Sequence, residues 1–532
     1  MPAKTIKTNK PDVARRLRKL VPVKINCSRS NLSERDTFLI KKLIEASKII
    51  NEVFLVQVYN KNKELKCELS ESKDKNDKLR LQYFLWNAGP WDRLNGNEPF
   101  IGHIKKRPGV EFYPSDMKKK EFEVWLTSHT KDSELFRSDR TVIRRKGNRL
   151  IAIPYSKEYR VLLEPVAKLL KEAARITDNL SLRKFLLSRA EALLSNNYLQ
   201  SEFDWMNLDS KIELTLGPYE VYEDKLFGYK ASFESFVTVK DEKESEKLQT
   251  YVGHLAEIDK NLPIDKKFRF THKQQKTSPI SVAIEVFAGG EADSGYRIPA
   301  FNLPNDHKIR EVKGSKKVLL KNIIEAKFNK IDLHVAKMIV HKSQLPYVTS
   351  EVYFNSLLFH ELSHGIGPAQ VILKNGLKAP INELLRELRS AIDEAMADVS
   401  GVYLALYFID KGILPKVMER QVYPTYMNTI IRDARFGILE SHAKGSMVEY
   451  NYLHEKGAIV YDASSGKFGV DYKIIRATLK ELLSALLNIL AEGSYEKAKI
   501  FLDEYAYIPP ELKKSYKRLS KVPTDIYPIF EF

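Results

Sequence analysis

The alternation of apolar and polar residues along the chain predicts helices in both halves of the sequence, with β-strands between them. Apolar side chains recur at helical spacing in segments 33–54, 160–200, 318–328, 352–364, 384–409, 426–439 and 474–490. Runs typical of β-strands occupy 212–216, 233–239 and 281–287, and the charged segment 240–275 between the last two has a helical pattern. The pattern therefore predicts a mainly helical α+β protein.

The segments outside this pattern are expected to be irregular. Residues 1–31 form a basic stretch without periodicity, residues 299–304 have the composition of a loop, and the tail from residue 509 is rich in proline and aromatic residues. We expect an irregular arm, a loop and an extended strap, respectively. At 532 residues the chain exceeds the size of a single hydrophobic core, so we expect two lobes or domains.

Composition narrows the class of protein. The chain is 43% hydrophobic and 29% charged, as in folded globular proteins, and no apolar run reaches the roughly 18 residues that span a bilayer. Cys27 and Cys67 are the only cysteines, too few for a disulfide framework or a thiolate zinc site. Since the first 24 residues lack the apolar core of a secretion signal, we expect a cytoplasmic protein without a membrane partner.

The net charge of +18 raises the question of a nucleic-acid partner. The lysines are spread over the whole chain, their clusters are short, and no zinc-finger or RNA-binding motif accompanies them. The charge therefore favours a solvated basic surface, and we expect no nucleic-acid partner.

One short motif predicts chemistry. His360-Glu361-Leu362-Ser363-His364 follows an apolar run, and Gly365, Gly367 and Pro368 then end the predicted helix. The i,i+4 spacing places both histidines on one face, where they can share a Zn²⁺ ion. Glu361 lies beside that face and can take a proton from a water molecule that the metal activates. The alternative, two unrelated surface histidines, leaves these polar side chains within an apolar turn unexplained.

A catalytic zinc site needs a third protein ligand. Glu383 has the spacing common among enzymes with this motif, but it alternates with leucines as an exposed helical face does. Glu394 and Asp398 lie one turn apart among small residues that let two helices approach closely. We therefore expect Glu394 to bind the metal and Asp398, with the neighbouring Asp393, to support the ligands.

Further motifs stand in a fixed order along the chain. They are Glu220-Val221-Tyr222 with Phe227-Gly228 and Phe233-Glu234-Ser235-Phe236; Asn302-Leu303-Pro304-Asn305 with Arg310; His360 to Gly365; Asp393 to Asp398; and Glu440-Ser441-His442 with Glu455 and Gly457. Together they resemble the ordered motifs of the dipeptidyl peptidase III family of zinc metallopeptidases, over about residues 210–460. The zinc motif here is a pentapeptide, whereas the family usually has H-E-x-x-G-H. Asp393, Met396 and Ser446 also depart from the family pattern, which affects specificity more than chemistry.

The resemblance implies two lobes around a wide cleft. The upper lobe would be helical and carry zinc, and the lower lobe would contain a β-barrel. On this basis we assign residues 1–238 and 282–330 to the lower lobe, 239–281 and 331–504 to the upper lobe, and 505–532 to the C-terminal strap.

The resemblance also implies a role for each residue of the motifs. One zinc ion per chain would be bound by His360, His364 and Glu394, and Glu361 would be the general base. Tyr222 and His442 would stabilise the oxyanion, although both residue types also occur as structural hydrogen-bonding groups. The substrate would be held by Glu220, which would bind its N-terminal ammonium group, and by Glu234, Asn302, Asn305 and Arg310. The two asparagines have an alternative explanation as turn residues beside Pro304.

These roles predict a zinc exopeptidase that releases dipeptides from the N-terminus of short peptides. A monoaminopeptidase or another amide hydrolase with the same zinc site is the first alternative. A peptide-binding protein whose catalysis has lapsed is the second, and the intact Glu361 argues against it.

Overall fold

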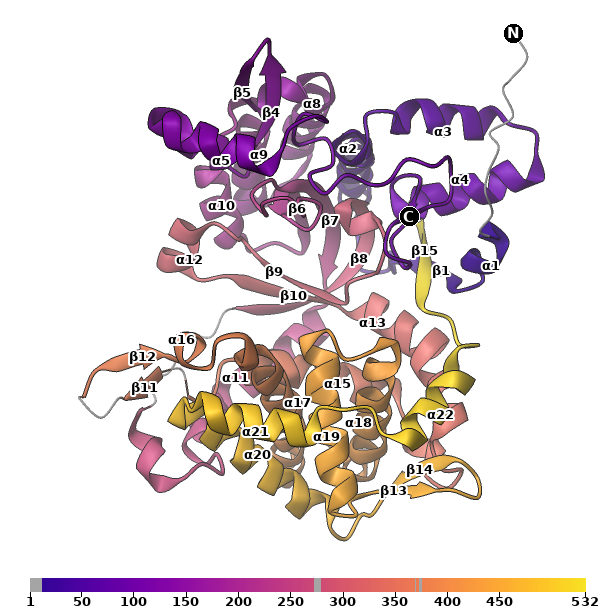
Figure 1. Ribbon diagram of the computed structural model, residues 1–532, viewed down its shortest axis with the longest axis vertical. Coiled ribbons are helices and arrows are strands. Elements are labelled where there is room, and N and C mark those ends of the chain that lie inside the picture. The colour runs from indigo at the N-terminus through magenta and orange to yellow at the C-terminus, as the bar shows by residue number, and fades with distance from the viewer. Residues whose placement is uncertain (1–11, 272–278, 369, 373–375) are drawn as a thin grey trace. The chain divides into compact units, whose positions relative to one another are not determined.

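The computed structural model describes residues 12–271, 279–368, 370–372 and 376–532, which divide into two compact units. The sheet unit comprises Met1–Glu242, Pro279–Ile323 and Asp525–Phe532. The helical unit comprises Lys243–Ser278 and Ile324–Thr524. The protein is therefore mainly helical with a smaller β component, as the sequence pattern predicts (Figure 1).

The sheet unit contains most of the strands. Its elements are α1(Val13–Leu17), β1(Leu20–Asn26), α2(Glu34–Val58), α3(Asn62–Glu71), α4(Lys75–Asn87), β2(Trp91–Asp92), β3(Glu98–Pro99), α5(Lys119–Ser128), η1(Thr130–Asp132), α6(Ser133–Arg137), β4(Thr141–Lys146), β5(Arg149–Pro154), α7(Tyr155–Glu158), α8(Arg160–Ile176), α9(Leu180–Ser195), α10(Leu199–Met206), β6(Ile212–Glu220), β7(Ser232–Lys240), β8(Ile280–Gly290), η3(Glu291–Asp293), β9(Ala300–Leu303), α12(His307–Lys313), β10(Lys316–Leu320) and β15(Asp525–Glu531).

A five-stranded sheet in the order β6-β7-β8-β10-β9 is the centre of this unit. The β8–β10 pair is parallel and the other pairs are antiparallel. Among the described strands, β6 and β9 are edges that do not pair with each other, so the barrel expected from the resemblance is not confirmed. Helix α2 packs on β7 and β8 through an apolar face that includes Leu43 and Ile50, both fully buried.

The two ends of the described chain meet in the sheet unit. Strand β15, at the C-terminus, pairs in parallel with β1, with Leu20 opposite Asp525 (Figure 1). The expected strap is therefore wrong in detail, because Pro510–Leu519 is a helix, α22, and Asp525–Glu531 is a paired strand. The irregular arm is also wrong for the described residues, which form α1 and β1.

A buried arginine fixes the end of β6. Arg189, fully buried on α9, forms an ion pair with Glu202 at 2.7 Å and donates hydrogen bonds to the carbonyl oxygen of Leu216 and the hydroxyl of Tyr219. Gly217 leaves room for this guanidinium, since a Cβ atom there would lie 2.7 Å from Nη1 of Arg189. Because a buried charge without its partner is costly, this network holds the segment that leads to Glu220.

The helical unit is built around long helices. Its elements are α11(Glu242–Lys260), η2(Lys266–Thr271), α13(Lys321–Lys327), which spans the boundary between the units, the π-helical segment η4(Phe328–Asp332), α14(Leu333–Ile339), η5(Leu345–Tyr347), α15(Ser350–Ser363), β11(Gln370–Ile372), β12(Lys378–Pro380), α16(Ile381–Leu385), η6(Arg386–Leu388), α17(Arg389–Asp410), η7(Lys416–Met418), α18(Glu419–Asp433), η8(Ala434–Phe436), α19(Ser441–Glu455), β13(Ile459–Asp462), β14(Lys467–Val470), α20(Ile475–Glu492), α21(Tyr495–Tyr505) and α22. Helix α17 packs against α15, α18, α19 and α20.

Local sequence signals explain several helix boundaries and fail at others. Ser33 and Asp36 form the expected capping box at the start of α2. The segment expected to be helical over 318–328 begins as strand β10, and the segment expected over 384–409 is interrupted by η6. The expected loop at 299–304 contains strand β9. These short strands form because they pair with neighbouring strands, which local periodicity does not report.

Candidate metal centre

The predicted metal-binding motif lies at the C-terminal end of α15. His360 and Glu361 are in the last turn, and the helix ends at Ser363, as the glycines that follow predict. His364 has φ −62° and ψ −14°, so it continues the helical backbone and keeps the i,i+4 relation to His360. The chain then turns at Gly367, whose φ of +82° favours glycine and whose N–H donates to Oδ1 of Asp259.

Two glycines let neighbouring helices reach this motif. A Cβ atom on Gly401 of α17 would lie 3.1 Å from the backbone nitrogen of His360. A Cβ atom on Gly445 of α19 would lie 3.0 Å from the backbone nitrogen of Ala395 on α17. The three helices α15, α17 and α19 therefore approach within backbone contact beside the motif, and α17 and α19 bring Glu394 and His442 to it.

The donor atoms of three residues form a compact triangle. Nε2 of His360 lies 3.2 Å from Nε2 of His364 and 3.3 Å from Oε2 of Glu394, and the third side, from His364 to Glu394, is 3.8 Å. In a tetrahedral zinc site with bonds of about 2.0–2.1 Å, neighbouring ligand atoms are separated by about 3.3–3.4 Å. The triangle has the size of one face of such a tetrahedron.

The chemistry of these groups also fits a metal ion. Oε2 of Glu394 is buried, and none of the three imidazole nitrogens that lie 3.1–3.8 Å away forms a hydrogen bond of good geometry with it. A buried carboxylate oxygen without a partner is costly, and a cation at the centre of the triangle would satisfy it. Two imidazole nitrogens and one carboxylate oxygen are a ligand set typical of catalytic zinc.

Asp398 supports the first ligand. Its Oδ1 lies 2.6 Å from Nδ1 of His360, so this nitrogen can donate to Asp398 and Nε2 would be the atom that binds a metal ion. Burial would lower the pKa of His360, but Asp398 and Glu394 raise it well above the usual value. Burial alone would raise the pKa of Glu394, but its contacts with His360 and His442 lower this pKa to about 2. This carboxylate is therefore ionised at neutral pH.

His442 forms a second possible group of metal ligands together with His360 and Glu394. Its Nε2 lies 3.1 Å from Oε2 of Glu394, and the donor atoms of His360, Glu394 and His442 all lie within 4.8 Å of one another. The side chain of His442 is 64% exposed, whereas that of His360 is 8% exposed. The geometry thus allows His442 either to bind a metal or to face a ligand beside it.

The other acidic residues near the motif differ in position. Asp393 lies 3.8 Å from Nδ1 of His364 and 3.4 Å from Arg389, so it is placed to orient the second histidine. Glu383 is exposed on α16.

The two other positions that depart from the family pattern are buried. The sulfur atom of Met396 accepts a hydrogen bond from the hydroxyl of Ser400 at 3.3 Å, and Ser446 is fully buried on α19.

The predicted substrate-binding residues lie in the sheet unit, and several of them are in contact. Nδ2 of Asn305 donates to Oε1 of Glu220 at 3.2 Å and to the carbonyl oxygen of Tyr219 at 3.0 Å. Arg310 donates to the carbonyl oxygen of Pro304 and to Oδ1 of Asn305. Asn302 is exposed on β9. The structure therefore joins Glu220, Asn305 and Arg310 in one hydrogen-bonded group.

Tyr222 and Glu234 lie near this group. Strand β6 ends at Glu220, so Tyr222 is in a turn, where it is 62% exposed. Partial burial of the hydroxyl and the nearby Glu220 carboxylate raise the pKa of Tyr222 to about 12. Glu234 on β7 is only 3% exposed, and burial, with Glu291 and Glu220 nearby, raises its pKa well above the usual value.

Two acidic residues here were missed by sequence reasoning. Glu291 follows Gly290, which pairs with Glu234 in the sheet, and burial raises the pKa of Glu291. Burial also raises the pKa of Glu223, but ion pairs with Arg93 at 2.6 Å and Lys106 at 2.7 Å lower it by more. The only signal for Glu291 was the pair of glycines that ends strand β8, because its neighbours are far apart in the sequence.

Comparisons with known proteins identify the class. A profile of peptidase family M49 matches residues 104–377. Nudix hydrolase 3 of Arabidopsis thaliana is 34% identical over an alignment of 570 residues that covers 97% of this chain and 73% of that protein. The chain belongs to peptidase family M49.

Two solved structures are similar over nearly the whole chain. DPP III from Caldithrix abyssi has 45% identity and a TM-score of 0.94, covering 97% of this chain and 99% of that one. Dipeptidyl-peptidase III from Corallococcus sp. strain EGB has 36% identity and a TM-score of 0.79, covering 97% and 96%. The resemblance seen in the sequence is confirmed, and so is the prediction of a metallopeptidase of the dipeptidyl-peptidase type.

None of the described helices combines the length and the apolar composition needed to cross a bilayer.

Proposed function

We propose that this protein is a zinc-dependent dipeptidyl peptidase that binds one zinc ion per chain through His360, His364 and Glu394. The observation that carries the proposal is the triangle of donor atoms, with sides of 3.2, 3.3 and 3.8 Å, one corner of which is the buried Oε2 of Glu394. Family membership gives the reaction, hydrolysis of a peptide bond. When bound, zinc supplies Lewis-acid chemistry, polarising the scissile carbonyl and lowering the pKa of the attacking water.

The chain's own residues would move the protons and stabilise the charge. Glu361, next to His360 on α15, would take the proton from the attacking water and pass it to the leaving amine. His442 would donate a hydrogen bond to the oxyanion that develops on the scissile carbonyl. We keep Tyr222 in the same role, and its pKa of about 12 ensures that its hydroxyl is protonated at neutral pH.

The free N-terminus of the substrate would be recognised by Glu220. A carboxylate is the natural partner of an α-ammonium group, and the contact with Asn305 holds the Glu220 side chain in place. Asn302, Arg310 and the buried Glu234 would complete this subsite.

The geometry allows His442 to be either an oxyanion donor or a metal ligand, and one variant distinguishes these two roles. His442→Ala is expected to retain about one zinc ion per chain and to lower kcat by about 10²–10³-fold, the loss typical of one oxyanion donor. Zinc content by elemental analysis and kcat with a dipeptidyl arylamide measure the two effects. Loss of the zinc in this variant would show that His442 is a metal ligand instead.

The position of cleavage tests the dipeptidyl assignment. Peptides with a free N-terminus should lose dipeptides, N-acetylated peptides should be poor substrates, and Glu220→Gln should weaken turnover of the free peptides without changing zinc content. Mass spectrometry of the products and a panel of dipeptidyl and aminoacyl arylamides provide the readout. Release of single amino acids would support the monoaminopeptidase instead, and efficient internal cleavage of N-acetylated peptides would make the protein an endopeptidase.

A further inference from the structure

A cavity in the sheet unit is separate from every residue assigned above to metal or substrate. It has a volume of about 390 Å³, which is within the range of about 300–1,000 Å³ typical of small-molecule sites. It is lined by Lys48, Asn51, Glu52, Phe54, Leu55, Lys66, Leu85, Trp86, Ala88, Gly290, Asp293, Ser294, Arg297, Tyr527, Pro528 and Phe530. These residues come from α2, α3, the end of α4, the segment around η3 and strand β15.

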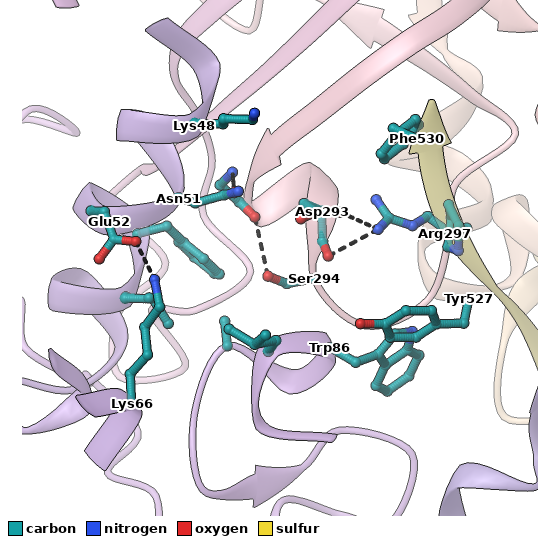
Figure 2. Close-up of a pocket in the computed structure, with 16 residues that line it drawn as sticks. Lys48, Asn51, Glu52, Lys66, Trp86, Asp293, Ser294, Arg297, Tyr527 and Phe530 are labelled. Atoms are coloured by element: carbon teal, nitrogen blue, oxygen red, sulfur yellow. Dashed lines mark hydrogen bonds and ion pairs between the residues drawn. The ribbon is translucent and has the colours of Figure 1, made fainter. Parts of the chain in front are cut away.

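Apolar and aromatic side chains make up about half of the lining of this cavity. Figure 2 shows Lys48, Asn51 and Glu52 from α2 on one side and Arg297, Tyr527 and Phe530 on the other. The aromatic rings of Phe54, Trp86, Tyr527 and Phe530 provide flat surfaces that suit a flat or apolar ligand body. Because β15 supplies two of these rings, the parallel β1–β15 pair helps to build the site.

Most of the polar groups in the lining already have partners. Lys66 forms an ion pair with Glu52 at 2.5 Å, and Arg297 forms one with Asp293 (Figure 2). The backbone N–H of Gly290 donates to Oδ1 of Asn51. The hydroxyl of Ser294 donates to the carbonyl oxygen of Gly290.

One cation in the lining has no partner. Lys48 is exposed and has no ion-pair partner among the described residues. Three cations and two carboxylates line the cavity, so its charge is one positive unit, located on Lys48. A ligand with one negative charge would balance that unit.

We infer that this cavity is a binding site for a small organic monoanion, a carboxylate attached to a flat apolar body. The carboxylate pairs with Lys48, and the apolar body lies among the aromatic rings. A single unpaired cation matches one negative charge, and the aromatic rings disfavour a compact, strongly hydrated anion such as inorganic phosphate.

The test uses the full chain and 3-phenylpropionate as the probe, with binding followed by isothermal titration calorimetry. The wild-type protein is expected to bind one equivalent, and the neutral amide of the probe is expected to bind at least tenfold more weakly. Lys48→Met should also weaken binding about tenfold, the typical effect of losing a charge-assisted hydrogen bond.

Two matched controls make the result specific to this cavity. Lys41→Met removes an exposed lysine of the same helix that does not line the cavity, and it should bind the probe like the wild type. His364→Ala should also bind it unchanged, because the site does not depend on zinc. No binding by the wild type, equal binding by Lys48→Met, or loss of binding in His364→Ala would each overturn the inference. Because Lys48 is exposed, Lys48→Met is expected to fold like the wild type.

Discussion

Glu361→Gln is expected to lower kcat/KM by about 10²–10⁴-fold, because an amide cannot accept the proton of the attacking water as the carboxylate beside His360 would. The amide has nearly the same size as the carboxylate, so the fold should be unaffected. Zinc content should also be unchanged, since the ligand triangle does not include Glu361. Steady-state kinetics with a dipeptidyl arylamide and elemental analysis measure the two quantities.

The matched control for this variant is Glu351→Gln, an exposed carboxylate in the first turn of the same helix. It should retain wild-type kcat/KM. A Glu361→Gln enzyme with substantial activity would contradict the assignment of the general base, and loss of zinc in that variant would show that Glu361 supports the metal instead.

His364→Ala and Glu394→Ala are expected to lose most of the bound zinc and, with it, the peptidase activity. Each substitution removes one of three donors from the triangle, and a zinc site with only two protein ligands binds the metal much more weakly. Purified wild-type protein should contain about one zinc ion per chain, and both variants much less. Elemental analysis after dialysis gives the zinc content.

Glu383→Ala is the control for the choice of third ligand. Glu383 was the competing candidate in the sequence, but it is exposed on α16, so its removal should leave zinc content and activity unchanged. If Glu383→Ala loses zinc while Glu394→Ala retains it, the third ligand has been assigned to the wrong helix.

The sequence by itself determined the metal-binding motif. The helical period around residue 360 places both histidines on one face of α15, and the glycines after His364 end that helix, so local rules were sufficient. The position of Glu394 and Asp398 one turn apart followed from the same periodicity in α17. The capping box at Ser33 and the mainly helical composition were predictable for the same reason, since helices are stabilised by contacts between residues three and four positions apart.

The tertiary structure decided which distant groups meet. The close packing of α15, α17 and α19, which Gly401 and Gly445 permit, places Glu394 beside the two histidines. It also places His442 beside Glu394 and Asp398 beside His360. The pairing of β15 with β1 and the acidic neighbours Glu223 and Glu291 likewise join residues remote in the sequence. Sequence periodicity reports which face of an element is buried, but the partner of that face is set by packing and by strand pairing across the whole chain.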